Sequence, residues 1–178
     1  MTNIVYENGI GSDFINQLSE FFEVEVQNEW SENSININNK WGKGSVRSMV
    51  FSYGVNLLRF DLTFREDIAF TFVYEETVPV DFIFLTKGGV DFKMPSEESH
   101  KLKSYQNIIV QYASFSKNSF TFAAKESVRL NIIRINPEEY IQNKNNNIEY
   151  SDSDTVCKGI LAEDQLFSSD PVGRACLR

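Results

Sequence analysis

The sequence predicts a mostly β protein, a sandwich or barrel of antiparallel strands, and two observations support this prediction. From about residue 33 to residue 136 the apolar residues follow a period of two, which is typical of half-buried strands. In VNLLRFDLTF, for example, Phe60, Leu62 and Phe64 alternate with polar residues. About nine or ten such segments follow one another with no long helix between them, so a doubly wound α/β fold is not expected.

Before the β region, residues 12–22 (SDFINQLSEFF) are expected to form a short helix. Phe14, Leu18 and either Phe21 or Phe22 recur at helical spacing and would share one face. A serine or aspartate at the start of the segment can cap its first turn. The sequence therefore predicts an N-terminal helix that packs on the β domain.

Within the β region, the alternation predicts which side chains share a face. In the segment 80–86 (VDFIFLT), Val80, Phe82 and Phe84 are expected to lie together on the interior face. The remaining strands are expected in the segments IAFTFVYE (68–75), NIIVQYASF (107–115), NSFTFAA (118–124) and SVRLNIIRIN (127–136).

The β pattern ends at Pro137, where PEEYIQNK looks like a helical turn with proline at the first helical position. An Asn-rich polar stretch (144–154) is expected to be a linker, and residues 154–167 could form a helix. After Pro171 a further helix is expected to open. We therefore divide the chain into a lead-in with a helix (1–32), a β-barrel (33–136), and a linker with the start of a helical dimerisation region (137–178).

Charge and composition limit the possible functions. The chain has 178 residues, a net charge of −8, and no run of basic residues, so this chain is not expected to bind DNA or RNA tightly. It shows no signal peptide and no apolar stretch of membrane-spanning length, which favours a cytoplasmic protein that does not bind membranes. Cys157 and Cys176 are then expected to be reduced thiols, with a disulfide as the less favoured alternative.

The glycine pair Gly88-Gly89 separates two apolar runs in DFIFLTKGGVDFKM. A phosphate-binding loop would need a helix after the glycines, but a strand pattern follows them. We therefore expect a β-hairpin turn, in which glycine supplies a positive φ.

A hairpin of this kind is found in the cupin jelly roll, a small barrel of antiparallel strands. Metal-binding cupins carry His-x-His, then a glutamate, then a turn glycine. Aligned at Gly88, those ligand positions fall on Glu75, Thr77 and Asp81, and the whole chain has one histidine. An oxygen-only set suits transition metals poorly, so we expect the barrel without a metal or other cofactor.

Catalytic patterns are weak. The pairs Glu75-Glu76, Glu97-Glu98 and Glu138-Glu139 are sequence neighbours, which point to opposite faces of a strand and cannot face each other across a cleft. His100 lies in an expected loop, and there is no G-x-S-x-G motif. We therefore expect no catalytic residues and no enzymatic activity.

The alternating aromatic residues have two interpretations. They can be plain core, or they can line a barrel mouth that holds a small molecule. Tyr74 and Tyr112 place hydroxyl groups on the otherwise apolar face, and a buried Tyr hydroxyl needs a partner. The candidate ligand contacts are Trp41, Phe60, Phe72, Tyr74, Phe82, Phe84 and Tyr112.

Four features together resemble the N-terminal domains of AraC-type transcriptional regulators, most closely those of Bacteroidetes. These are the W-G-x-G start at Trp41, the strand LLRFDLTF, the E-D-I turn at residues 66–68, and the glycine at Gly88. The resemblance covers about residues 33–136. It implies a cupin-like jelly-roll, or double-stranded β-helix, with a short N-terminal helix and C-terminal helices.

The resemblance also implies a function. The domain would bind a small effector, often a sugar-like metabolite, in a metal-free barrel, and would pair with a second copy. DNA would be contacted only by a C-terminal helix-turn-helix domain that is not part of this sequence. Two alternatives stay open: a metal-free cupin isomerase or epimerase, which would need a base such as His100 inside the barrel, and a carbohydrate-binding jelly-roll module.

Overall fold

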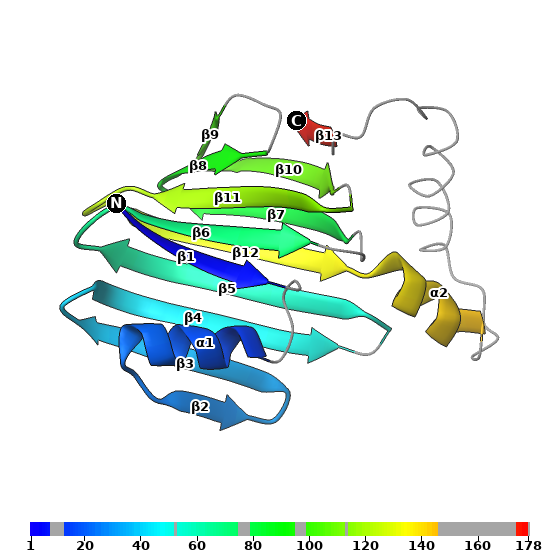
Figure 1. Ribbon diagram of the computed structural model, residues 1–178, viewed down its shortest axis with the longest axis horizontal. Coiled ribbons are helices and arrows are strands. Elements are labelled where there is room, and N and C mark those ends of the chain that lie inside the picture. The colour runs from blue at the N-terminus through cyan, green and yellow to red at the C-terminus, as the bar shows by residue number, and fades with distance from the viewer. Residues whose placement is uncertain are drawn as a thin grey trace.

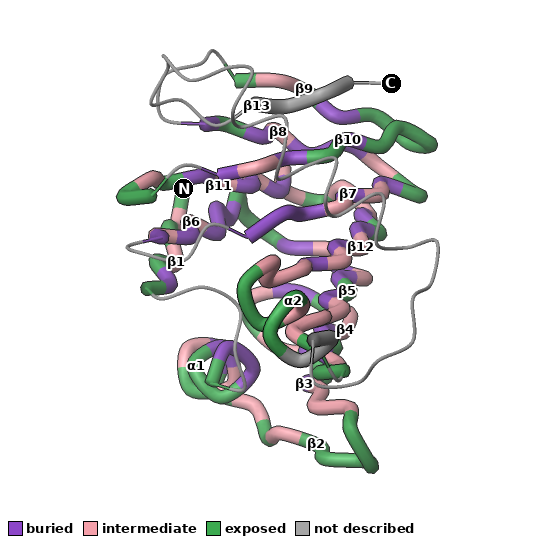
Figure 2. The backbone as a smooth tube through the Cα atoms, turned by 90° about the vertical axis from the view of Figure 1, so that its right-hand side faces the viewer, coloured by how far each residue is buried: buried purple, intermediate pink, exposed green. Residues whose placement is uncertain are grey.

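The computed structural model shows two β-sheets packed face to face, with one helix at each end of the β region (Figures 1 and 2). It describes residues 1–7, 13–51, 53–74, 79–94, 99–112, 114–145 and 174–177. The elements are β1 (Thr2–Glu7), α1 (Asp13–Phe22), β2 (Val26–Glu29), β3 (Glu32–Asn39), β4 (Gly42–Phe51), β5 (Val55–Phe64), β6 (Ile68–Tyr74), β7 (Val80–Lys87), β8 (Gly89–Lys93), β9 (His100–Lys103), β10 (Gln106–Gln111), β11 (Ser116–Phe122), β12 (Ser127–Ile135), α2 (Pro137–Asn145) and β13 (Arg174–Leu177).

The strand order is that of a jelly roll. The large sheet has the order β13-β10-β7-β12-β5-β4-β3-β2, and the small sheet has the order β1-β6-β11-β8-β9. From β5 to β12 the chain changes sheet at every connection except the one between β8 and β9, which pair directly. Four strands of the large sheet (β10-β7-β12-β5) thus face four of the small sheet (β6-β11-β8-β9), the eight-stranded arrangement of cupins. The predicted mostly β, cupin-like fold is confirmed.

The core lies between the sheets, as the period-two pattern requires. The inward side chains of β5, β6, β11 and β12 are almost fully buried, and Figure 2 shows buried positions along the strands of both layers. Phe60, Phe70 and Phe122 pack together with ring centroids 5.4–5.6 Å apart. Burial of this aromatic surface is the main favourable contribution to folding.

The predicted helix over residues 12–22 is confirmed as α1, and it completes the small layer. The small sheet does not extend over β3 and β4, and α1 lies beside the inner face of these strands instead (Figure 2). Phe14, Ile15, Leu18 and Phe22 are buried, and Phe22 stacks on Phe64 at 5.8 Å. The segment before the barrel also contributes strands that the sequence did not predict: β2 joins the large sheet, and β1 pairs in parallel with β6.

The side chains of β7 that point into the core are not the ones predicted. Ile83 and Leu85 are at most 1% exposed, whereas Phe82 and Phe84 are partly exposed on the outer side of the large sheet. The prediction was wrong because residues 82–85 are all apolar, so that both alternations fit the pattern. Asp81, which lies on the same side of β7 as Ile83 and Leu85, is fully buried.

The hairpin predicted at Gly88-Gly89 is also wrong, although Gly88 does lie between β7 and β8, the second of which begins at Gly89. β7 belongs to the large sheet and pairs with β10 and β12, whereas β8 belongs to the small sheet and pairs with β11 and β9. Gly88, with φ of 80°, is therefore the corner at which the chain passes from one sheet to the other. Local patterns cannot distinguish the two cases, because both need a turn between strands.

At the C-terminal side, the helix predicted at Pro137 is confirmed as α2. The helix expected to open after Pro171 is contradicted, since residues 174–177 form β13, which pairs with β10 at the edge of the large sheet. The helix predicted over 154–167 and most of the predicted linker lie outside the described residues. In the described part of the chain, no helix combines the length and the apolar character needed to cross a bilayer.

A buried polar cluster as candidate ligand site

Five polar side chains meet between the sheets at the end of the jelly roll from which α2 leaves. We call Tyr74, Asp81, Tyr112, Asn118 and Arg134 the Arg134 cluster. Each is at most 4% exposed. Tyr74 lies on β6 and Asn118 on β11, in the small sheet. Asp81 lies on β7, Arg134 on β12 and Tyr112 directly after β10, in or next to the large sheet, so both sheets contribute. The register explains their meeting, since Arg134 pairs with Asp81 across β12 and β7.

A bidentate ion pair forms the centre of the cluster. Arg134 Nε donates to Asp81 Oδ1 at 2.7 Å, and Arg134 Nη2 donates to Asp81 Oδ2 at 2.6 Å. Both charges are removed from water, which is costly unless the geometry is good and the remaining polar groups are hydrogen-bonded. Two parallel N–H···O bonds provide that geometry.

The tyrosines extend this network. Tyr112 Oη donates to Asp81 Oδ2 at 2.9 Å, and Tyr74 Oη accepts a hydrogen bond from Arg134 Nη2. The two phenol rings stack with centroids 4.6 Å apart, and the guanidinium carbon of Arg134 lies 5.0 Å from the Tyr74 ring centroid. The rings thus form an aromatic wall around the charge, and cation–π attraction adds to the ion pair.

Burial shifts the ionisation of these groups. Desolvation, the largest effect, raises the pKa of Tyr74 and of Tyr112 well above the ordinary value of 10.0, and the Asp81 carboxylate raises both further. Burial alone would lower the pKa of Arg134, but the charge of Asp81 outweighs it and holds that pKa above its ordinary value. At neutral pH the guanidinium is therefore charged and both phenols are protonated.

These raised tyrosine pKa values predict a loss of stability in alkali. Above pH 10, the ordinary Tyr pKa, an unfolded chain releases the Tyr74 and Tyr112 protons that the folded chain retains. The contribution of the two tyrosines to the free energy of unfolding is complete below pH 10. Above pH 10 it falls by up to about 1.4 kcal/mol per pH unit for each tyrosine. Urea unfolding at a series of alkaline pH values measures the slope. The double variant Tyr74→Phe/Tyr112→Phe should flatten it, and an equal slope in both proteins would contradict this prediction.

The hydrogen bonds of the cluster leave several buried atoms without a partner. Among the described residues, the buried side-chain polar atoms without a hydrogen bond are Arg134 Nη1, Asn118 Oδ1, Ser116 Oγ and Trp41 Nε1. The first three belong together: Asn118 and Ser116 are two residues apart on β11, and Ser116 pairs with Tyr74. An unpaired buried polar group costs about 1–3 kcal/mol, so a concentration of them in one place favours a site filled by water or a ligand.

The cluster does not fit a divalent metal. Asp81, which aligns with the metal-binding glutamate of cupins, already accepts hydrogen bonds on both oxygens, from Arg134 and Tyr112. A metal would have to displace the guanidinium or lie beside its positive charge. In the described ranges, no three His, Cys, Asp or Glu side chains gather closely enough to hold a metal. Glu75 and Thr77, the other aligned positions, lie outside those ranges.

The structure brings together only part of the predicted ligand site. Tyr74 and Tyr112 belong to the cluster, and the guanidinium carbon of Arg134 lies 5.7 Å from the ring centroid of Phe72. Phe60 is core, 1% exposed and in contact with Phe70. Phe82 and Phe84 face outward from the large sheet, as described above.

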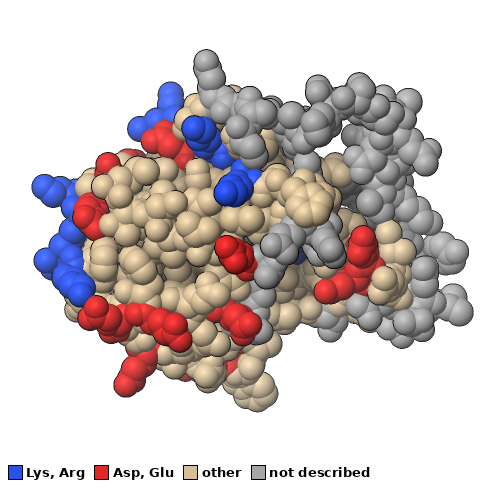
Figure 3. All heavy atoms as spheres, in the orientation of Figure 1, with Lys and Arg blue, Asp and Glu red and all other residues tan. Residues whose placement is uncertain are grey.

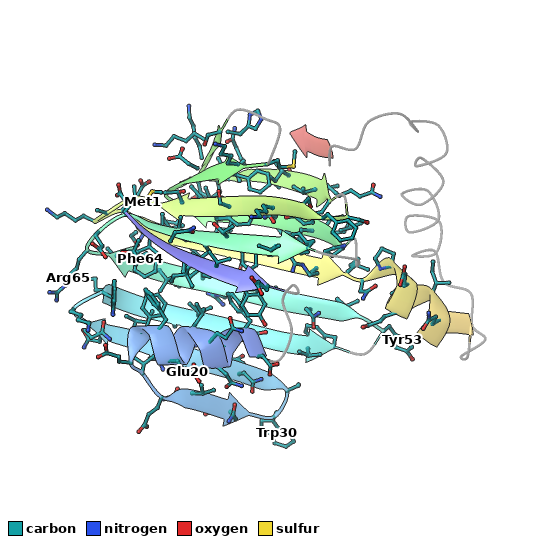
Figure 4. All side chains as sticks on the ribbon, viewed as in Figure 1. Met1, Glu20, Trp30, Tyr53, Phe64 and Arg65 are labelled. Atoms are coloured by element: carbon teal, nitrogen blue, oxygen red, sulfur yellow. The ribbon has the colours of Figure 1, made fainter. Side chains whose placement is uncertain are left out.

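Trp41 lies at the opposite end of the molecule from the cluster. Its carbonyl accepts a hydrogen bond from Arg65 just beyond the end of β5, whereas Arg134 pairs with Asn56 near the start of β5. Nine residue steps along the strand separate Asn56 from Arg65, about 30 Å. Figure 4 marks the two ends with Arg65 and Tyr53. The Trp41 ring packs against Phe21 of α1 at 4.8 Å, so its surroundings are those of a core residue.

His100, the base that an isomerase interpretation would need, begins the edge strand β9 and is partly buried. Its row across the small sheet runs through Phe92 and Phe120 to Phe70, which is four residues before Tyr74 on β6. The backbone of His100 is therefore separated from that of Tyr74 by three strand spacings across the sheet, about 14 Å, and by four residues along β6, about 13 Å. The register does not place His100 beside the tyrosines.

Sequence reasoning missed Asp81, Asn118 and Arg134 as site residues. A signal was present for Arg134, because it falls on the inward parity of SVRLNIIRIN with Leu130 and Ile132. An arginine at an inward position of a strand needs a buried partner. Asp81 is likewise a charged residue in an otherwise apolar strand. The ion pair could have been proposed from these two charged residues, one of each sign, in two apolar strands.

The comparisons with known proteins give matches only among solved structures. No family model and no curated protein matches the sequence. Among solved structures, KdgF from Halomonas sp. matches with a TM-score of 0.38 and 7% identity, over 64% of this chain and 89% of that one. A single-residue mutant of Bacillus subtilis oxalate decarboxylase OxdC matches with a TM-score of 0.38 and 8% identity, over 65% and 28%. The Drosophila melanogaster CENP-C cupin domain matches with a TM-score of 0.33 and 14% identity, over 63% and 75%. These values are low, so the cupin-like assignment depends on the strand order itself.

Proposed function

We propose that this cupin-like domain is the effector-sensing and dimerisation part of an AraC-type transcriptional regulator. It would bind a small molecule at the Arg134 cluster, without a metal, and would catalyse no reaction. The observation that supports binding is the group of unpaired atoms, Arg134 Nη1, Asn118 Oδ1 and Ser116 Oγ, at one end of the jelly roll. A jelly roll commonly binds ligands at such a position.

The path from this site to the following helix is short, which is what a sensor needs. Arg134 lies two residues before Asn136, and α2 begins at the next residue. Asn136 holds the junction: its backbone N–H donates to the Gly54 carbonyl at 2.8 Å, and its side-chain oxygen accepts from the backbone N–H of Glu138 at 3.2 Å. A ligand that fixes Arg134 would therefore favour one position of α2 over others.

In this proposal the output is a change in how two copies associate. The segment from α2 onward would contact the second copy, and a helix-turn-helix domain outside this sequence would read DNA. The charge of the domain suits that division, because a net charge of −8 opposes direct binding to phosphates. The proposed location is the cytoplasm.

A thermal-shift screen of the domain against mono- and disaccharides, sugar acids and aromatic metabolites tests the binding step. A compound that binds only the folded state raises the melting temperature by mass action. We expect Tyr112→Phe to weaken the response at least tenfold in dissociation constant, since it removes the hydrogen bond that orients Asp81. The control is Tyr105→Phe, because Tyr105 is 89% exposed in the turn before β10.

Three outcomes would contradict the proposal. A folded protein that gives no shift with any compound would favour a filled core whose function is to pair subunits. A hit that Tyr112→Phe and Tyr105→Phe bind equally would place the site elsewhere. Recovery of the hit unchanged after long incubation supports sensing, whereas conversion to an isomer would support the enzyme interpretation instead.

A further inference from the structure

The charges in the Arg134 cluster cancel. Arg134 supplies one positive charge, Asp81 supplies one negative charge, and the bidentate pair joins them directly. Tyr74, Tyr112 and Asn118 are neutral at neutral pH. Among the described residues, the site therefore has unused hydrogen-bonding capacity but no unbalanced charge, which is a different chemistry from that of an anion site built around a free arginine.

The unpaired atoms define what a ligand must present. Nη1 of Arg134 carries two N–H donors and no acceptor. The hydrogen bond to Tyr112 fixes the orientation of the Asn118 amide. The Tyr112 hydroxyl donates its proton to Asp81, so the Tyr112 oxygen can only accept, and it accepts from Asn118 Nδ2, 3.4 Å away. Asn118 Oδ1 is then directed elsewhere as an acceptor, and Ser116 Oγ can act either way.

From these two observations we infer that the ligand of this site is uncharged where it meets the cluster. It presents a hydrogen-bond acceptor to Arg134 Nη1 and a donor to Asn118 Oδ1. A carboxamide or a pair of neighbouring hydroxyl groups meets both requirements. The inference depends on the proposed sensor function and narrows it to neutral polar ligands.

Charged groups fit the same site less well. A carboxylate can accept from Arg134 Nη1, but it has no donor for Asn118 Oδ1, and it adds a buried negative charge beside Asp81, whose own charge is already matched. A buried charge without a partner is strongly unfavourable. An ammonium group meets Asn118 Oδ1 but lies beside the positive charge of Arg134.

Matched pairs of compounds that differ only in this group test the inference. We would measure melting temperature and calorimetric binding with glucuronamide against glucuronate, and with benzamide against benzoate, at neutral pH. The expected result is a dissociation constant at least tenfold lower for the amide of a pair. An acid that binds the wild-type protein as tightly as its amide would overturn the inference.

Variants add a second, independent readout. Asn118→Ala removes the acceptor and should reduce the preference for the amide to the part that the Asp81 charge supplies, whereas the control Ser119→Ala, on the outward face of the same strand, should keep the full preference. Asp81→Asn removes the negative charge, so the acid should now bind better than the amide. If Asp81→Asn does not fold, Asn118→Ala still decides, since within the described residues the Asn118 side chain makes one hydrogen bond, at 3.4 Å.

The outcomes separate this inference from the sensor proposal. Binding of the acids alone overturns the neutral-ligand inference and leaves a sensor of anions. No response to any pair or to the broader screen, in a folded protein, means that water fills the site and overturns both. A preference for amides that Asn118→Ala leaves intact overturns the assignment of the donor to Asn118.

Discussion

Asp81→Asn is expected to lower the free energy of unfolding by about 3–5 kcal/mol, the range for removing one partner of a buried ion pair. Asparagine has nearly the same shape as aspartate, so packing changes little. The loss comes from the Arg134 guanidinium, which is 4% exposed and would be left without its counter-charge. It also comes from the Tyr112 hydroxyl, which would lose its charged acceptor. Urea unfolding followed by circular dichroism measures the change.

The control for this variant is Asp61→Asn. Asp61 also pairs with an arginine on β12, Arg129, at 2.7 Å, but the two side chains are 35% and 44% exposed. Exposed pairs typically contribute less than about 1 kcal/mol, so the control should change the midpoint little. Equal losses in the two variants would mean that burial of the Asp81–Arg134 pair is not what makes it important.

Joint replacement of the pair separates its net contribution from the cost of breaking it. Replacing a buried ion pair by apolar residues of similar volume is often neutral. Asp81→Leu with Arg134→Met should therefore be more stable than Asp81→Asn alone. Such a variant would fold but would lack the donor Arg134 Nη1. It would show that the pair is kept for binding rather than for stability.

The fold was largely predictable because most strands give one unambiguous pattern. In β5, apolar and polar residues alternate strictly from Leu58 to Phe64, and every predicted inward residue is buried. The prediction for β7 was wrong because its four adjacent apolar residues, 82–85, fit both alternations. β1 could not be predicted from its neighbours, since it pairs with residues 66 positions later in the chain.

The site was less predictable because it depends on contacts between distant residues. Arg134 and Asp81 lie 53 residues apart, and only the sheet register brings them together. Sequence spacing gave the two tyrosines but also added Trp41, which the β3–β4 turn places at the far end. The same register puts the basic end of the molecule, around Arg65, away from the cluster (Figure 3).

Gly88→Ala is expected to cost about 2–4 kcal/mol, because Gly88 forms the corner between the two sheets. Its φ of 80° is strained for any residue with a Cβ. An alanine Cβ would also lie 2.5 Å from the Ser127 carbonyl oxygen, a backbone atom that β12 holds in place. Moving that atom would disturb the strand that carries Arg134. The loss should therefore appear both in the urea midpoint and in weaker ligand binding.

The neighbouring glycine provides a matched control for this prediction. Gly89→Ala meets only the ends of flexible side chains, Glu126 Oε1 at 3.1 Å and Lys101 Cε at 3.2 Å. These can move aside, so the expected change is within about 0.5–1 kcal/mol. A hairpin with both glycines in its turn would be sensitive at both positions, whereas a corner at Gly88 is sensitive at one. Equal losses in the two variants would contradict the corner, and a loss confined to Gly88 would mean that this residue alone directs the chain from the sheet of Asp81 to the sheet of Asn118.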